Sequence, residues 1–186
     1  MDRVSLSIKN IDAVIQDLNQ ILQVRELADE KKEAVYFADV VDAIKTSIYN
    51  TVLSEKVLFN CHFEVGSMFT VKSYLYSIFY NLTSNSIKYR RADVQPILTI
   101  ESHKLKNKIE FVFKDNGKGI DLHKNGDHIF GLYKRFDTTT EGKGMGLFMV
   151  KTQVEALGGT INIISKPGEG TEFIIQFDLQ SVLPPM

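Results

Sequence analysis

The sequence lacks several features that would define its class at once. It has one cysteine, Cys61, which excludes an internal disulfide framework and a cysteine-rich metal site. It has 22 basic and 23 acidic residues, and this balance argues against a dedicated surface for nucleic acids or anionic membranes. It has no apolar run long enough to cross a bilayer, no secretory signal and no internal repeat. These absences indicate a soluble chain, which we expect to lie in the cytoplasm. If the chain is part of a longer protein, that protein can still be anchored in a membrane.

The length of 186 residues predicts one domain and an appendage. Apolar residues recur at spacings of three and four near the start of the chain, at Ile8, Ile11, Ile15, Leu18 and Leu22. This heptad pattern predicts one long helix over 4–32, either in a helical bundle or packed on its own globular domain. Because the charged segment 29–33 follows it, we predict two domains. These are 1–33, which contains this helix, and 34–186.

The second predicted domain alternates imperfectly between helical and strand patterns. Helices are predicted over 39–49, 71–90 and 144–157. Strands are predicted over 56–64, 97–103, 108–114, 161–165 and 173–177. This order favours an α+β fold, in which a mixed sheet of about five strands carries helices on one face. Segment 115–142 is rich in glycine and charge and too long for an ordinary loop, which indicates a functional role.

The first motif is polar and lies on the helix predicted over 71–90. Asn81, Asn85 and Lys88 fall at positions i, i+4 and i+7, so they project from the same side. Asparagine oxygens suit a hard cation, and a lysine suits phosphate oxygens. Taken alone, the pattern is more typical of a solvated helix face, which amides and lysines usually cover.

The second motif, Asp-Asn-Gly-Lys-Gly-Ile over 115–120, directly follows a predicted strand. Its alternate glycines let the backbone approach a flat ligand, and a carboxylate at a strand end can accept a hydrogen bond from an exocyclic amine. A tight turn with an aspartate cap is the alternative interpretation.

The third motif places several glycines, over 141–147, at the start of a predicted helix. Unpaired N–H groups and the positive end of the helix dipole would form a phosphate site there. A flexible hinge is the alternative.

In this order the three motifs resemble the ATP-binding fold of the GHKL ATPases, and more narrowly the catalytic domain of sensor histidine kinases. Residues 81–89 are similar to the family's N box, 115–119 and 142–147 to its two G boxes, and 129–136 to its F box. Tyr133 stands where phenylalanine is commoner. The resemblance implies that 34–186 is an ATP-binding kinase catalytic domain with a two-layer α/β sandwich, the Bergerat or GHKL fold, preceded by one long N-terminal helix. It also implies that 1–33 is the C-terminal helix of a partial dimerisation and phosphoacceptor bundle.

The resemblance also implies roles for individual residues. Asn85 would ligate a Mg²⁺ ion that bridges the phosphates of ATP, and Asp115 would bind the adenine amine. Asn81 and Lys88 are the expected catalytic residues, and Lys88 would also contact phosphate. Further contacts with the nucleotide are expected from Tyr89, Gly117, Gly119, Ile120, Arg135, Gly142, Gly144, Met145, Gly146, Leu147 and Thr171.

The residue type at position 81 indicates which chemical group accepts the phosphoryl group. Related ATPases and serine kinases resemble each other in carrying glutamate there, which can take a proton from water or a serine hydroxyl. An asparagine cannot, whereas a neutral imidazole already has a free lone pair. The chain therefore resembles a protein-histidine kinase. The alternatives are a non-catalytic nucleotide-sensing or dimerisation module, or a GHKL serine kinase or ATPase.

None of the four histidines (His62, His103, His123 and His128) falls on a predicted helix ahead of the ATP site. We therefore expect the chain to be part of a longer kinase, to lack the acceptor histidine, and to be inactive in autophosphorylation by itself. The resemblance implies four partners. They are ATP, the phosphoacceptor helix of the same kinase, a response regulator receiver domain, and a second copy bound through the N-terminal helix.

Overall fold

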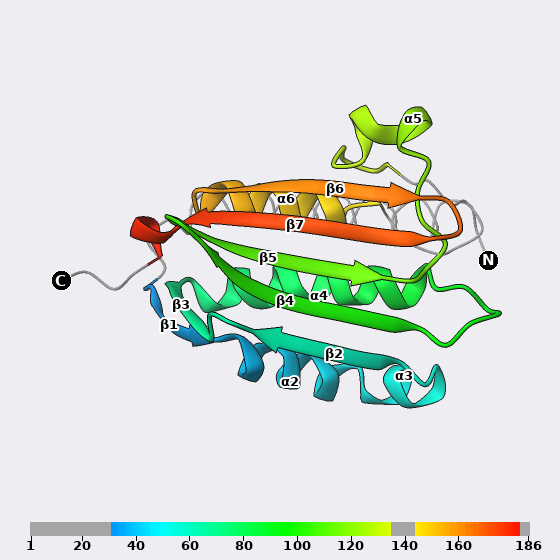
Figure 1. Ribbon diagram of the computed structural model, residues 1–186, viewed down its shortest axis with the longest axis horizontal. Coiled ribbons are helices and arrows are strands. Elements are labelled where there is room, and N and C mark those ends of the chain that lie inside the picture. Colours follow the sequence, from blue (N-terminus) through cyan, green and yellow to red (C-terminus); the bar gives the residue numbers. More distant parts are fainter. Residues whose placement is uncertain (1–30, 135–143, 183–186) are drawn as a thin grey trace, which may run out of the picture. The chain divides into compact units, whose positions relative to one another are not determined.

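The computed structural model describes residues 31–134 and 144–182 (Figure 1). The chain divides into two units, 1–30 and 31–186. The helix predicted over 4–32 lies almost entirely outside the described residues, so the division at residue 33 stays a prediction. In the described part of the chain, no helix has both the length and the apolarity needed to span a membrane.

A five-stranded mixed sheet forms one layer of the second unit, in the order β2-β4-β5-β7-β6 (Figure 1). Its strands are β2 (Leu58–Phe63), β4 (Ile97–Leu105), β5 (Lys108–Asp115), β6 (Gly159–Lys166) and β7 (Gly170–Asp178). The edge strand β2 runs parallel to β4, and the other neighbouring strands pair antiparallel. The predicted mixed sheet is confirmed, and the antiparallel pairing of β5 with β7 brings Asp115 close to the start of β7.

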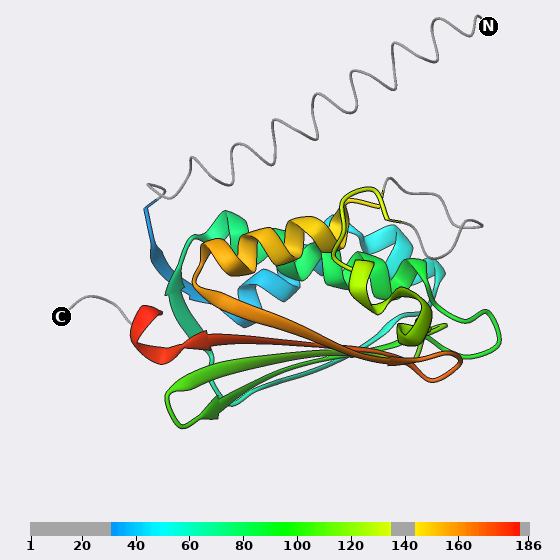
Figure 2. The ribbon, with the colours of Figure 1, turned by 90° about the horizontal axis from the view of Figure 1, so that it is seen from above.

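Helices form the second layer and cover one face of the sheet (Figure 2). They are α2 (Phe37–Ser47), α4 (Lys72–Lys88) and α6 (Gly146–Ala156). The shorter elements are α3 (Tyr49–Ser54), α5 (Leu122–Asn125), η2 (Gly126–His128) and η3 (Leu179–Ser181). The predicted two-layer α+β architecture is confirmed.

Two features around α2 differ from the prediction. Strands β1 (Glu33–Tyr36) and β3 (Ser67–Thr70) form a separate antiparallel pair, which the sequence pattern did not indicate. Helix α2 begins at Phe37, two residues earlier than predicted. The Phe37 N–H donates a hydrogen bond to Gly66 O at 3.0 Å, and the Phe37 side chain is fully buried. Both differences arise from contacts with residues about thirty positions away, which local periodicity cannot report.

An aromatic cluster holds α4 against the sheet. The Phe79 ring of α4 lies edge-on to Phe111 and Phe113 of β5, with centroid separations of 5.4 and 4.7 Å. Phe37 of α2 also contacts Phe111, at 4.7 Å. All four rings are essentially inaccessible to solvent. Because the next turns of α4 carry Asn81 and Asn85, this packing sets the position of the asparagine motif relative to Asp115.

Truncating this cluster should unfold the domain more easily. We expect Phe79→Ala to lower the free energy of unfolding by about 3–5 kcal/mol, because it removes buried apolar contacts and leaves a cavity. The neighbouring Tyr80→Ala is the control, since Tyr80 is 37% exposed and its loss should cost far less. Urea denaturation of the two variants measures the difference. Equal losses would contradict the role assigned to Phe79.

Candidate nucleotide-binding site

A cavity of about 380 Å³ opens between α4, the end of β5 and the start of α6. Its volume lies in the range of small-molecule sites. The predicted site residues that line it are Asn81, Asn85, Lys88, Tyr89, Asp115, Gly119, Ile120, Gly144, Met145, Gly146, Leu147 and Thr171. Gly117 is not among the lining residues, and Arg135 and Gly142 lie outside the described residues. The structure thus gathers three segments that are far apart in the sequence.

Sequence reasoning missed several residues that line the same cavity. They are Ser84, Lys118, Asp121, Ile129, Lys134 and Phe173. Ser84, Lys118 and Ile129 lie inside motifs already recognised, so the motif boundaries could have indicated them. Phe173 lies on β7, two residues beyond Thr171, and enters the cavity wall through strand pairing, for which the local sequence holds no signal.

Asp115 ends β5 with a carboxylate that accepts three hydrogen bonds. Its Oδ1 accepts from the backbone N–H groups of Gly117, at 2.8 Å, and Thr171, at 3.2 Å. Its Oδ2 accepts from the Ser86 hydroxyl of α4 at 3.0 Å. Burial raises the pKa of the Asp115 carboxyl above its ordinary value, and these three hydrogen bonds oppose that rise. The carboxylate is therefore held in one orientation, with acceptor capacity facing the cavity.

The asparagines of α4 meet the start of α6. Asn81 Nδ2 donates to Ser77 O, one turn earlier, at 2.8 Å. A Cβ atom on Gly146 would lie 3.0 Å from Asn81 Oδ1 and 3.6 Å from Asn85 Nδ2, so the glycine allows the two helices to approach closely. Among the described residues, the Asn85 side chain makes no hydrogen bond with protein. Its amide borders the cavity and remains available to a ligand or a metal ion.

The residues that the sequence predicted to contact phosphate also line this cavity. The residues 144–147 that open α6 line the cavity, and the first backbone N–H groups of a helix attract anions. Lys88, at the end of α4, lines the same cavity, with its Nζ 5.0 Å from the centre of the Tyr89 ring. The arrangement supplies a carboxylate at one end of the cavity and positive potential at the other.

Close backbone packing explains the glycines after Asp115. Gly119 has φ +68°, and a Cβ there would overlap the backbone oxygen of Lys166, the last residue of β6. A Cβ on Gly117 would meet Tyr89 O at 2.8 Å. The expected reason was room for a flat ligand. In the structure these glycines make room for the protein's own chain, and Gly119 then also borders the cavity.

This packing predicts a large effect of Gly119→Ala on stability. Gly168→Ala is the matched control, because Gly168 also has positive φ but nothing within 4 Å of an added Cβ. The control should cost about 1–2 kcal/mol from backbone strain alone. Gly119→Ala should lower the free energy of unfolding by about 1–3 kcal/mol more, because an atom must also be displaced. Thermal and urea unfolding measure both. Similar losses of stability in the two variants would contradict the steric role assigned to Gly119.

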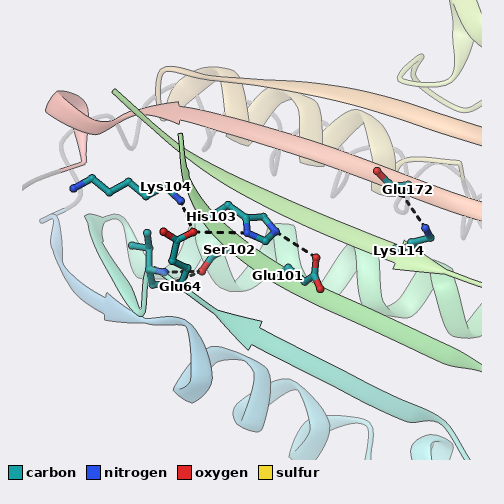
Figure 3. A network of polar contacts seen from close by, with 8 residues as sticks. Glu64, Glu101, Ser102, His103, Lys104, Lys114 and Glu172 are labelled. Carbon is teal, nitrogen blue, oxygen red and sulfur yellow. Dashed lines mark hydrogen bonds and ion pairs between the residues drawn. The ribbon is translucent and has the colours of Figure 1, made fainter. Parts of the chain in front are cut away.

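Two of the four histidines lie on predicted strands, and the other two lie on short helices within the segment predicted to be a long loop. His62 is on β2, His103 on β4, His123 on α5 and His128 on η2. His103 Nε2 lies 3.3 Å from Glu101 Oε2, and its Nδ1 lies 3.8 Å from Glu64 Oε2 (Figure 3). None of the four lines the cavity.

Comparison with known proteins identifies the family. The histidine kinase-, DNA gyrase B- and HSP90-like ATPase family matches residues 70–181, which is more than half of the chain. The chain belongs to this family. Its similarity to sensor kinases within the family, described next, makes the described unit an ATP-binding catalytic domain of the sensor histidine kinase type.

Two curated relatives illustrate the similarity. The phytochrome-like protein Cph1 of Synechocystis is 32% identical over 78% of this chain and 20% of its own length. The sensor protein kinase WalK of Staphylococcus aureus is 28% identical over 92% of this chain and 43% of its own length. The chain therefore spans less than half the length of either relative.

Solved structures share the fold. The Acinetobacter baumannii histidine kinase AdeS superposes with a TM-score of 0.72 at 19% identity, covering 96% of this chain and 86% of that one. Full-length ShkA, solved in complex with AMPPNP, superposes with a TM-score of 0.72 at 16% identity, covering 95% of this chain and 37% of that one. The expectation of a GHKL-type fold is confirmed.

Proposed function

We propose that this chain is the catalytic part of a two-component sensor histidine kinase. It would transfer the γ-phosphoryl group of ATP to a histidine on a dimerisation helix of the same kinase, and none of the four histidines of this chain is the proposed acceptor. One observation carries the proposal. Asp115, the face formed by Asn81, Asn85 and Lys88, and the start of α6 border a single cavity within a domain of the ATPase family.

We expect ATP to lie with its adenine at Asp115 and its phosphates at the start of α6. The adenine amine would donate to the Asp115 carboxylate, which two backbone N–H groups and Ser86 already hold in place. The phosphates would lie against the first N–H groups of α6 and near the Lys88 ammonium. Ile120 and Leu147 would provide apolar walls. Gly142 and Arg135 remain proposed phosphate-side contacts from the segment outside the described residues.

The residues present also fit Mg²⁺. The Asn85 amide borders the cavity and makes no hydrogen bond among the described residues, and an amide oxygen is a hard ligand of the kind this ion accepts. Asn85 would hold the ion against the phosphates. When bound, Mg²⁺ would supply charge neutralisation on the phosphoryl oxygens. Lys88 and the first backbone N–H groups of α6 would position the phosphates of ATP.

Asn81 would place the γ-phosphoryl group without acting as a base. Its Nδ2 donates a hydrogen bond to Ser77 O, and its Oδ1 lies beside Gly146. An imidazole nitrogen attacks phosphorus with its own lone pair, and the bond to the β,γ-bridging oxygen breaks to release ADP. No proton needs to be removed from the attacking atom. This is the reason for preferring a histidine acceptor over a hydroxyl acceptor.

The partners follow from this activity. We propose the phosphoacceptor helix of the same kinase as the direct substrate and a response regulator receiver domain as the next acceptor. A second copy would bind through the N-terminal helix. Because the proposed phosphate donor is ATP, we place this domain on the cytoplasmic side of any membrane that the parent protein spans.

Phosphotransfer to a separate segment tests the proposal. The chain, γ-labelled ATP and a dimerisation segment carrying the acceptor histidine should give acid-labile, alkali-stable phosphohistidine on that segment. Replacing the acceptor histidine by alanine should remove the label. Nucleotide binding with no transfer would instead support a nucleotide-sensing module. Rapid ATP hydrolysis without an acceptor would instead support an ATPase.

A further inference from the structure

A second cavity lies beside the nucleotide cleft and is strongly basic. It has a volume of about 750 Å³ and is formed by the turn before β2, the segment 88–96 and Lys118. Its basic lining residues are Lys56, Lys88, Arg90, Arg91 and Lys118, whereas its acidic ones are Glu55 and Asp93. The chain as a whole has a net charge of −1, so this excess of positive charge is local.

The two acidic residues of this cavity are already paired with arginines. Arg90 Nη2 lies 2.6 Å from Glu55 Oε2, and Arg91 Nε lies 4.0 Å from Asp93 Oδ1. Within the described ranges, neither Lys56 nor Lys88 forms an ion pair. The charges of Lys56 and Lys88 are therefore not compensated by an ion pair in a concave surface, where field lines are focused and a counter-anion is attracted.

Arg91 carries a buried donor without an acceptor. Its Nη1 donates to Gly168 O at 2.6 Å, which fixes the plane of the guanidinium group. Its Nε is inaccessible to solvent and has no hydrogen-bond partner in the described part of the chain, since the Asp93 carboxylate is too distant. The Arg91 side chain as a whole is 31% exposed, so the remaining N–H groups of the fixed guanidinium group stay within reach of an anion in the cavity.

Side-chain hydrogen bonds fix the segments that form the wall of the second cavity. Gln95 Nε2 donates to Lys56 O at 3.0 Å, which holds the Lys56 backbone in its left-handed conformation, φ +53°. Asn116 bonds both to Gln95 O and to the Ile97 N–H, each at 2.9 Å. These bonds connect the turn before β2, the segment before β4 and the loop after β5. The basic side chains are therefore presented from a preorganised wall.

We propose that this second cavity binds a small multivalent anion of the oligophosphate class, and that its occupation weakens ATP binding in the adjoining cleft. Lysines and a fixed guanidinium group suit phosphate oxygens. The coupling arises because Lys88 and Lys118 line both cavities. An anion in the second cavity draws on the same positive charge that ATP phosphates need and adds negative charge beside them. Such coupling is reciprocal.

Inorganic pyrophosphate is the probe, used at constant ionic strength and constant free magnesium. It is titrated into the ATP-saturated protein while the backbone amide resonances of 91–95 are followed, so that the nucleotide cleft is already filled. Lys56→Glu is the test variant. Lys106→Glu is the matched control, since Lys106 is also exposed with positive φ, +48°, but lines neither cavity.

We expect saturable shifts in the wild type and Lys106→Glu, and about tenfold weaker pyrophosphate binding in Lys56→Glu, since a favourable charge becomes a repulsive one. In separate titrations, pyrophosphate should raise the Kd for ATP several-fold to a plateau in the wild type but not in Lys56→Glu. Absence of the shifts, or equal titrations of both variants, would overturn the proposal. If the Kd for ATP kept rising with pyrophosphate concentration without reaching a plateau, pyrophosphate would be competing with ATP in the nucleotide cleft. That result would also overturn the proposal.

The test separates this inference from the proposed function. If the wild type binds no ATP, the proposed function fails, and the pyrophosphate titrations of the three proteins without ATP still decide the second site. If ATP binds and pyrophosphate does not, only this inference fails.

Discussion

Asn85→Asp is expected to lower the affinity for Mg²⁺-ATP by about 100-fold or more, because it places a negative charge beside the phosphates in a partly buried site. The new carboxylate would also lie near the first N–H groups of α6, since Asn85 Nδ2 is 3.6 Å from where a Cβ on Gly146 would be. It would thus compete with phosphate for those donors. Isothermal titration calorimetry measures the affinity, and thermal unfolding should show an intact fold.

Asn162→Asp is the control for net charge. Asn162 is an exposed residue of β6 that does not line either cavity, so this substitution changes the net charge equally and should leave ATP affinity unchanged. If Asn85→Asp bound ATP as tightly as this control, the phosphate-side position assigned to Asn85 would not hold.

The second large effect is expected from Asp115→Asn. Two backbone N–H groups, of Gly117 and Thr171, require an acceptor at the Oδ1 position, so the amide oxygen of the variant should occupy it. The amide nitrogen then replaces Oδ2 and can donate to Ser86 Oγ. It also presents a donor where the adenine amine donates. Adenine binding should fall by about 100-fold or more, as in other sites where a buried polar pairing is lost.

Stability should not fall with this variant at neutral pH. Burial raises the pKa of the Asp115 carboxyl, so ionisation costs folding free energy in the wild type. The cost appears as pH rises from the unfolded pKa, about 4, to the folded pKa, because the native state holds the proton more tightly. Asp115→Asn does not titrate. Relative to the wild type, its free energy of unfolding should therefore increase across that interval.

Urea denaturation at several pH values measures this difference. Asp178→Asn, at the exposed end of β7, should track the wild type in both stability and adenine affinity. A stability of Asp115→Asn that stayed well below the wild type at pH 7 would contradict the proposed exchange of hydrogen bonds. Unchanged nucleotide affinity would contradict the assignment of Asp115 to the adenine.

Local patterns predicted the parts of the site that are local. The spacing of Asn81, Asn85 and Lys88 determines a common helix face, because α-helical geometry is the same wherever the helix packs. A carboxylate at the end of an apolar strand and glycines at a helix start are likewise readable without the fold. Asp115 and Gly146 were therefore recognisable before any contact between them was known.

Long-range contacts decided what the patterns could not. The β1–β3 pair and the earlier start of α2 depend on segments about thirty residues apart. The reason for glycine at 119 is the approach of Lys166 O, at the end of β6 and more than forty residues later. Periodicity reports the environment of one segment and holds no information about which distant segment provides it.

The sequence by itself determined the kind of chemistry, because residue types and their spacing within one helix or strand end specify which donors and charges a segment can present. Only the tertiary structure decided that Asp115, the α4 asparagines and the start of α6 border one cavity. It also placed Lys56 and Arg91 around a second cavity, with Lys88 and Lys118 lining both. The physical reason is that strand pairing and helix packing set these separations, and both depend on contacts between residues far apart along the chain.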